Sequence, residues 1–127
     1  MRRADRFVLI VDDYGTMRRI MRNLLGQIGF SHVEEAVDGE SALGRLRERS
    51  FDLVISDWQM EPMSGLDLLK AVRADARFHH LPFIMVTAAN KVSNVVTAKA
   101  AGVNNYIVKP FTAETLNRKI DEVFGAA

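Results

Sequence analysis

Short apolar runs alternate with longer segments of helical periodicity along the whole chain. Residues 7–11 form a continuous apolar run rich in β-branched residues, which is typical of a strand buried on both faces of a parallel sheet. Similar runs lie at 53–55 and 83–86, and weaker ones lie at 33–36 and 106–108. These five runs predict five β-strands.

The segments between the runs carry apolar residues at helical spacing. Gly29 suits the end of the first helix, Asp38-Gly39 predicts a turn into the second, and Thr112 is a plausible N-cap for the fifth. The fourth is expected to end near Gly102. The apolar residues that mark the five helices are, in chain order, Met17, Ile20, Met21, Leu24, Leu25 and Ile28; Ala42, Leu43 and Leu46; Leu66, Leu69 and Val72; Val92, Val95, Val96 and Ala100; and Leu116, Ile120, Val123 and Phe124.

Strand and helix thus alternate five times, which indicates a single α/β domain over residues 1–127. Such alternation implies a parallel sheet with helices on both faces, and right-handed crossovers leave few topologies. Ligands bind such sheets beyond the carboxyl ends of the strands. The candidate functional residues are therefore those that directly follow each apolar run.

Composition narrows the class of protein. The 17 basic and 16 acidic residues nearly balance, which gives no reason to expect nucleic acid or a membrane as a partner. The absence of cysteine excludes disulfides and thiolate metal ligands, and it fits a reducing compartment. The apolar run at 7–11 is too short for a signal peptide or a membrane span. We therefore expect a cytoplasmic protein. A monomer is also our expectation, although these features do not determine the oligomeric state.

Polar residues of few types follow the apolar runs. Asp12 and Asp13 follow the first run, Asp57 the third, Thr87 the fourth and Lys109 the fifth. Each alone has an ordinary explanation, because an Asp often caps a helix and a lone Lys is usually a solvated charge. All of them meeting on one rim of the sheet is much less expected by chance.

The acidic part of this rim indicates a bound cation or a retained proton. Two carboxylates about 4 Å apart repel by roughly 1–4 kcal/mol at the dielectric of water or a protein surface. Carboxylate oxygens without neighbouring His or Cys suit Mg²⁺, which binds through a few carboxylates and keeps water and phosphate oxygens as its other ligands.

The same residues resemble the motif set of response-regulator receiver domains over about residues 7–124. The matching stretches are Val11-Asp12-Asp13, Ser56-Asp57-Trp58, Thr87-Ala88 and Lys109-Pro110-Phe111. Within that family, the chain most resembles the stand-alone chemotaxis regulators (CheY-like). The stretches that carry this likeness are Met17-Arg18-Arg19-Ile20, Arg22-Asn23-Leu24-Leu25, Asp57-Trp58 and Tyr106. The resemblance implies a flavodoxin-like (βα)5 fold, a doubly wound five-stranded parallel sheet in the order 2-1-3-4-5 that these regulators exemplify.

The resemblance also implies a role for each residue on the rim. Asp57 is the expected phosphoacceptor, and Asp12, Asp13, Asp57 and the backbone carbonyl of Gln59 are the expected Mg²⁺ ligands. Lys109 is expected to offer its positive charge to the phosphoryl oxygens.

The resemblance implies that two further residues change conformation when Asp57 is phosphorylated. Thr87 is expected to donate its hydroxyl to the phosphoryl group, and Tyr106 is expected to turn inward when Thr87 moves. A half-buried strand aromatic is the ordinary alternative for Tyr106. The Lys109-Pro110 bond is expected to be cis, and Trp58, the sole tryptophan, is expected to report metal binding by its fluorescence.

The implied partners are a sensor histidine kinase as phosphoryl donor, a flagellar motor-switch protein and a phosphatase. The alternatives are a phosphate sink that drains the kinase and an adaptor or relay outside the motor pathway. A separate enzyme activity is not expected. An aspartyl phosphatase would need Asp-x-Asp where this chain has Asp12-Asp13-Tyr14, a P-loop is absent, and an acidic rim suits a flavin phosphate poorly.

Some positions depart from the family pattern. Gln59 stands where the chemotaxis type often has Asn, Ala89 leaves a water-controlling position small, and residues 60–65 differ from the usual run after the phosphoacceptor. Phosphoryl lifetime and phosphatase dependence therefore do not transfer. The basic patch of Arg18, Arg19 and Arg22 is either a solvated helix face or a kinase-docking surface.

Overall fold

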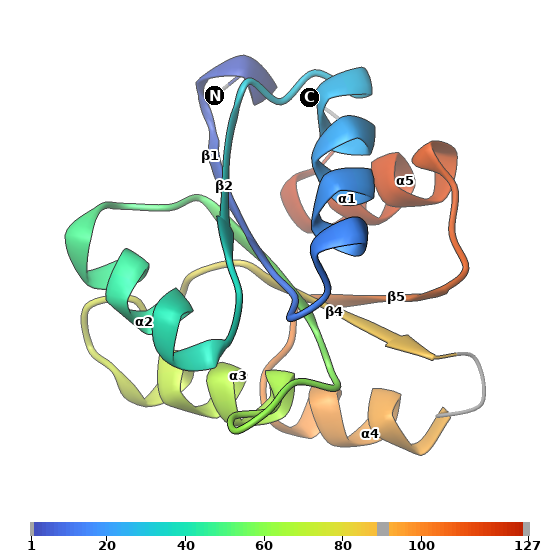
Figure 1. The fold of residues 1–127 in the computed structure, drawn as a ribbon. Coiled ribbons are helices and arrows are strands. Elements are labelled where there is room, and N and C mark those ends of the chain that lie inside the picture. The colour runs from blue at the N-terminus through green and yellow to red at the C-terminus, as the bar shows by residue number, and fades with distance from the viewer. Residues whose placement is uncertain (1, 89–91, 126–127) are drawn as a thin grey trace.

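The computed structural model describes residues 2–88 and 92–125 and contains all five expected βα units (Figure 1). A short 3₁₀ helix, η1 (Arg3–Asp5), precedes the first strand. The strands are β1 (Phe7–Val11), β2 (His32–Ala36), β3 (Leu53–Asp57), β4 (Phe83–Ala88) and β5 (Asn105–Lys109). The helices are α1 (Gly15–Gln27), α2 (Gly39–Glu48), α3 (Gly65–Ala74), α4 (Val92–Ala100) and α5 (Ala113–Phe124).

The five strands form one parallel sheet in the order β2-β1-β3-β4-β5, which confirms the expected topology. The strand order reverses at β1, because β2 lies on one side of it and β3 on the other. In the register, Val11 pairs with Ser56 and Asp57 pairs with Val86. The carboxyl ends of the three central strands therefore lie level with one another, and the residues that follow them meet at one edge.

The helices cover both faces of the sheet. In Figure 1, α1 and α5 lie on one side of the strands, and α2, α3 and α4 lie on the other. Alternate residues of each strand enter the two cores, as the pleat of a strand requires. In β1, Val8 and Ile10 pack with α1 and α5, whereas Leu9 and Val11 pack with α2 and α3. Burial on both faces explains why the central strands are continuous apolar runs.

The predicted helix ends are confirmed. Gly29 has a φ of 106°, and the N–H of Phe30 donates to the carbonyl of Leu25 at 3.0 Å, which closes the last turn of α1. The Asp38 side chain accepts a hydrogen bond from the Ser41 N–H and caps α2. Thr112 caps α5 in the same way by accepting from the Thr115 N–H.

The predicted buried face of α4 is wrong. Among the described side chains of the helix, Ala98 is buried at 1% exposure and Val95 is partly buried, whereas Val96 is 69% exposed and Ala100 is also exposed. The side chain of Val92 lies outside the described residues. Alanines and valines lie all round this helix, so its apolar spacing did not single out the face that contacts the sheet. The helix ends before Gly102, as expected.

Smaller corrections concern α1 and α3. Ile20 was expected on the core face of α1 but is 44% exposed. In α3, Leu68 is fully buried beside Leu69 and Val72, whereas Leu66 is only partly buried. Within the described residues, no helix is long and apolar enough to cross a bilayer.

Candidate functional site at the carboxyl edge of the sheet

Three carboxylates converge where β1 and β3 end. Asp12 follows β1 and is 4% exposed, Asp57 is the last residue of β3 and is 9% exposed, and Asp13 is exposed. Each offers one carboxylate oxygen to a group whose members lie within 4.8 Å of one another. The register places them together, because Val11 and Ser56 are opposite each other.

The turn that carries Asp12 is fixed by three hydrogen bonds. The Asp12 N–H donates to the Ala36 carbonyl at 3.2 Å, which continues the β1–β2 pairing. The Tyr14 N–H donates to Asp12 Oδ1 at 2.9 Å, and Arg18 Nη1 donates to the Asp12 carbonyl at 2.9 Å. The carboxylate is therefore held at the edge of the sheet by both its backbone and its side chain.

The electrostatics of the cluster favour a cation. Burial raises the pKa of Asp12 above its usual value. The Tyr14 N–H and the charge of Lys109 act in the opposite direction, whereas the charges of Asp57 and Asp13 raise the pKa further. The cluster consists of oxygen donors alone, which is the ligand set that hard divalent cations prefer.

One ammonium group lies against the phosphoacceptor candidate. Lys109 is the last residue of β5, and its Nζ lies 3.1 Å from Asp57 Oδ1. The Lys109–Pro110 bond is cis, as expected. Among the described residues, Lys109 is the one cation that pairs with these three carboxylates, so this part of the site retains a negative excess that a divalent cation would offset.

Thr87 completes the set and connects it to α4. Its side chain is 3% exposed near the end of β4, and Asn94 Nδ2 donates to its Oγ1 at 3.4 Å. Asn94 was not singled out from the sequence. A single polar residue among the alanines and valines of α4 does not predict a contact with Thr87, because that contact depends on how α4 lies beside β4.

The comparisons agree with this geometry. The family model for the response regulator receiver domain matches residues 8–121. The chain belongs to this family. It is 53% identical over 117 residues to the chemotaxis protein CheY of Pseudomonas aeruginosa, covering 92% of this chain and 94% of that protein. It is equally identical to CheY-3 of Vibrio cholerae, with 92% and 90% covered, so the expected resemblance to stand-alone chemotaxis regulators is confirmed.

Solved structures show the same fold. The receiver superimposes on CheY4 of Vibrio cholerae with a TM-score of 0.85 at 35% identity, covering 93% of this chain and 98% of that one. A response regulator receiver protein from Pseudomonas putida gives a TM-score of 0.83 at 30% identity, with 92% and 96% covered.

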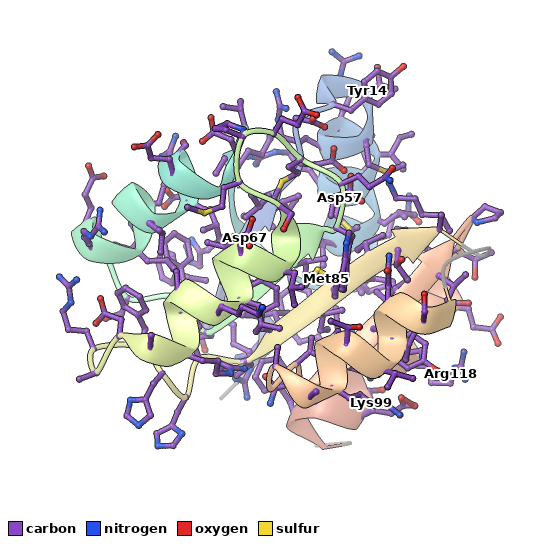
Figure 2. All side chains as sticks on the ribbon, turned by 90° about the horizontal axis from the view of Figure 1, so that it is seen from below. Tyr14, Asp57, Asp67, Met85, Lys99 and Arg118 are labelled. Carbon is purple, nitrogen blue, oxygen red and sulfur yellow. The ribbon has the colours of Figure 1, made fainter. Side chains whose placement is uncertain are left out.

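In this receiver, Tyr106 is half-buried on β5 between two lysines. The ammonium of Lys119, on α5, lies 4.3 Å from the centre of the Tyr106 ring, and that of Lys99, on α4, lies 5.7 Å from it. Figure 2 shows Lys99 on α4. Val96 and Val108 are also exposed on α4 and β5. The surface of α4, β5 and α5, hereafter the α4–β5–α5 face, thus combines positive charge, an aromatic ring and exposed apolar groups.

The basic patch on α1 is largely paired within the receiver. Arg18 Nε lies 3.0 Å from Glu35 Oε1, and Arg22 Nε lies 2.7 Å from Glu35 Oε2. Partial burial of Glu35 is outweighed by these hydrogen bonds and charges, so its pKa is lowered. We call the pairing of Glu35 with Arg18 and Arg22 the Arg18–Glu35 clamp. Because Arg18 also donates a hydrogen bond to the Asp12 carbonyl, this clamp connects β2 and α1 to the acidic cluster.

The loop after Asp57 is tied closely to the strand. The Trp58 N–H donates to the Val86 carbonyl at 2.9 Å, and the Gly65 N–H donates to the Trp58 carbonyl at 2.8 Å. Ser64 and Asp67 form a reciprocal capping box at the start of α3. The Glu61–Pro62 bond is cis, which was not predicted from the sequence.

The positions that depart from the family pattern are only partly described. Gln59 and Glu61 are exposed, and Ala89 lies outside the described residues. Tyr14 is 64% exposed and lies at the outer edge of the molecule in Figure 2. Asp57 is buried, and the neighbouring carboxylate of Asp13 is exposed.

Proposed function

We propose that this receiver accepts a phosphoryl group on Asp57 from the phosphohistidine of a sensor histidine kinase or from a small acyl phosphate. A carboxylate oxygen of Asp57 forms a bond to phosphorus as the bond from phosphorus to the imidazole nitrogen breaks. The imidazole leaves with that electron pair and takes a proton from solvent. The observation that carries the proposal is the placement of Asp57 against Lys109 Nζ at 3.1 Å and within 4.8 Å of two further carboxylates.

Asp12, Asp13 and Asp57, with the backbone carbonyl of Gln59, are the residues that would hold Mg²⁺. Their oxygen-only chemistry fits this ion. When bound, Mg²⁺ neutralises the carboxylates and the incoming phosphoryl oxygens, which a weak carboxylate nucleophile requires. Lys109 would then bind a phosphoryl oxygen in place of its present contact with Asp57.

The signal would pass through Thr87. Its hydroxyl now accepts from Asn94 on α4, and a phosphoryl group of about −1.5 to −2 charges would draw the hydroxyl toward Asp57 as a donor. Such a movement would release Asn94 and make room for Tyr106 to turn inward from between its two lysines. The α4–β5–α5 face would change shape, with partner affinities shifting about 5–150-fold, as couplings of ~1–3 kcal/mol allow.

We further propose that the output is chemotaxis through the flagellar motor switch, in the cytoplasm, by a monomer that has no separate substrate. The similarity to CheY proteins of two bacteria supports this output. The combination of positive charge and apolar groups on the α4–β5–α5 face is suited to an amphipathic acidic segment of a partner. A phosphatase that removes the phosphoryl group would complete the circuit. Neither nucleic acid nor a membrane is a proposed partner.

The experiment is a titration with an N-terminal peptide of a motor-switch protein, with Mg²⁺ and with or without beryllofluoride as a phosphoryl mimic. Trp58 emission reports whether the mimic has bound, and Asp57→Asn is the matched control. A gain of tenfold or more in wild type alone would support the motor output. An unchanged affinity, with Trp58 still responding, would contradict it in favour of a phosphate sink or an adaptor.

A further inference from the structure

A groove lies at the amino ends of the strands, on the opposite edge of the sheet from Asp57. Its volume is about 630 Å³. The α2–β3 and α3–β4 connections form most of it, on the left of Figure 1, with residues just before β1 and at the end of α5. Five-residue strands, roughly 17 Å long, separate it from the acidic cluster. No residue of the acidic cluster lines the groove.

Apolar side chains form the floor of the groove, and four arginines and two histidines line its walls. Leu46, Phe51 and Leu81 are each at most 9% exposed and form part of the lining, so the floor is the outer surface of the core. The positive and imidazole side chains of the walls are Arg6, Arg47, Arg49, Arg77, His79 and His80.

Two of these guanidinium groups are already paired. Arg77 Nη2 lies 2.7 Å from Asp75 Oδ2, and Arg49 Nε lies 3.0 Å from Glu34 Oε2. The hydrogen bonds from Arg77, and to a smaller extent the nearby charge of Arg47, lower the pKa of Asp75 to about 2. Arg77 and Arg47 therefore both lie close to this corner of the groove.

The other two guanidinium groups keep their donors. Within residues 2–88 and 92–125, neither Arg6 nor Arg47 has an ion pair with an acidic side chain. The Arg6 guanidinium is stacked 3.9 Å from the centre of the Phe124 ring, which positions it without using its N–H groups. The lining also holds two acidic residues: Glu48, which is exposed, and Asp52, which already accepts from the Phe7 N–H at 2.8 Å.

We propose that this groove binds a small organic phosphate with a planar apolar part, the chemistry of a mononucleotide. Unpaired guanidinium groups match phosphate oxygens in a fork geometry, and they are less strongly hydrated than ammonium groups. A bare anion would leave the carbon floor uncovered, whereas a purely apolar ligand would leave the guanidinium groups without partners. The volume falls in the ~300–1,000 Å³ range of small-molecule sites.

The position of the groove makes this site independent of the phosphorylation site. Its ligand would not meet the acidic cluster, so Mg²⁺ is not required, and of α5 it would contact only the last residue, Phe124. The phosphoryl group on Asp57 and the ligand in the groove could be present together.

The test is a titration of the protein with adenosine monophosphate, followed by amide chemical shifts, at low ionic strength and without Mg²⁺. Adenosine alone and inorganic phosphate alone are the partial probes. We expect adenosine monophosphate to bind at least tenfold more tightly than either, with shifts at residues 46–52 and 76–82. Equal affinity for the nucleotide and for phosphate, or shifts confined to the acidic cluster or to the α4–β5–α5 face, would overturn the proposal.

Variants locate the site. Arg47→Gln changes an exposed helix position and should weaken binding at least fivefold without unfolding the protein, and Arg6→Gln should do the same from the other wall. Arg19→Gln, which is exposed on α1 outside the groove, is the matched control and should bind as wild type does. Asp57→Asn should also leave the affinity unchanged. Wild-type affinity in both groove variants, or lost affinity in Asp57→Asn, would contradict the assignment.

Discussion

Lys109 Nζ lies 3.1 Å from Asp57 Oδ1, so the ammonium group that is expected to bind a phosphoryl oxygen now contacts the nucleophile itself. The contact joins the ends of β5 and β3, which are not neighbours in the sheet. It partly offsets the charge of three carboxylates, and an incoming cation would have to share those oxygens with it.

Lys109→Gln should therefore bind Mg²⁺ more tightly than wild type, by about three- to tenfold, because a competing positive charge is removed. The rate of phosphorylation from acetyl phosphate should fall by about tenfold or more, because a charge on the phosphoryl oxygens is lost. Trp58 emission against Mg²⁺ concentration gives the affinity. Lys70→Gln, an exposed change on α3, should alter neither quantity, and an unchanged Mg²⁺ affinity in Lys109→Gln would show that the ammonium does not compete.

Asp12→Asn should stabilise the metal-free protein at pH 7, by about 1 kcal/mol or more, because carboxylates about 4 Å apart repel by roughly 1–4 kcal/mol. Burial and the charges of Asp57 and Asp13 raise the pKa of Asp12, so the ionised carboxylate costs stability above its usual pKa of 3.8. The amide oxygen can still accept from the Tyr14 N–H. Urea unfolding without Mg²⁺ should show a higher free energy of unfolding for the variant than for wild type. Added Mg²⁺ should stabilise wild type but not the variant.

The control for this comparison is Asp5→Asn, an exposed acid in η1 outside the cluster, which should show neither effect. If metal-free Asp12→Asn is no more stable than wild type, the ionised carboxylate of Asp12 does not destabilise the folded protein, and the prediction is wrong.

Glu35→Gln should lower stability at neutral pH by up to about 1 kcal/mol, because two partly exposed ion pairs are lost. The pKa of Glu35 is lowered in the folded protein, so its contribution is present above pH 4.5 and disappears as the pH falls below that value. The stabilities of variant and wild type, measured by urea unfolding from pH 7 to pH 3, should converge in acid. Glu48→Gln, an exposed position, should show no such convergence, and a constant gap for Glu35→Gln would refute the explanation.

Gly65→Ala should destabilise the receiver by about 1–3 kcal/mol and slow its phosphorylation. A Cβ there would lie 2.2 Å from the Asp57 carbonyl oxygen and 2.8 Å from Met85 Sδ, so the phosphoacceptor strand would have to move. Gly44→Ala is the matched control, because a Cβ in that interior turn of α2 meets no atom within 4 Å. It should stabilise by about 0.5–1 kcal/mol. Thermal unfolding of both variants measures the contrast.

The sequence predicted the fold well because strands buried on both faces are continuous apolar runs with an abrupt end. The runs before Asp12 and before Asp57 located the edge of the sheet where the carboxylates meet. The roles of these residues came from the family resemblance and remain predictions for phosphorylation and metal binding.

Contacts between elements could not be read in the same way. The Arg18–Glu35 clamp and the Asn94–Thr87 hydrogen bond join residues whose proximity depends on how a helix lies against its strand. The face of α4 was wrong for a related reason, because small apolar residues all round a helix leave its orientation to tertiary packing. The groove is formed by the α2–β3 and α3–β4 connections together with Arg6 and Phe124 near the two ends of the chain. No single segment of the sequence therefore predicts it.

The central claim is tested most directly by the intact mass of the protein after incubation with acetyl phosphate and Mg²⁺, followed by peptide mapping. Wild type should gain one phosphoryl group on the peptide that contains Asp57, and Asp57→Asn should gain none. The gain should disappear when Mg²⁺ is removed by a chelator. A phosphoryl group on another peptide of wild type, or an equal gain in Asp57→Asn, would contradict the account.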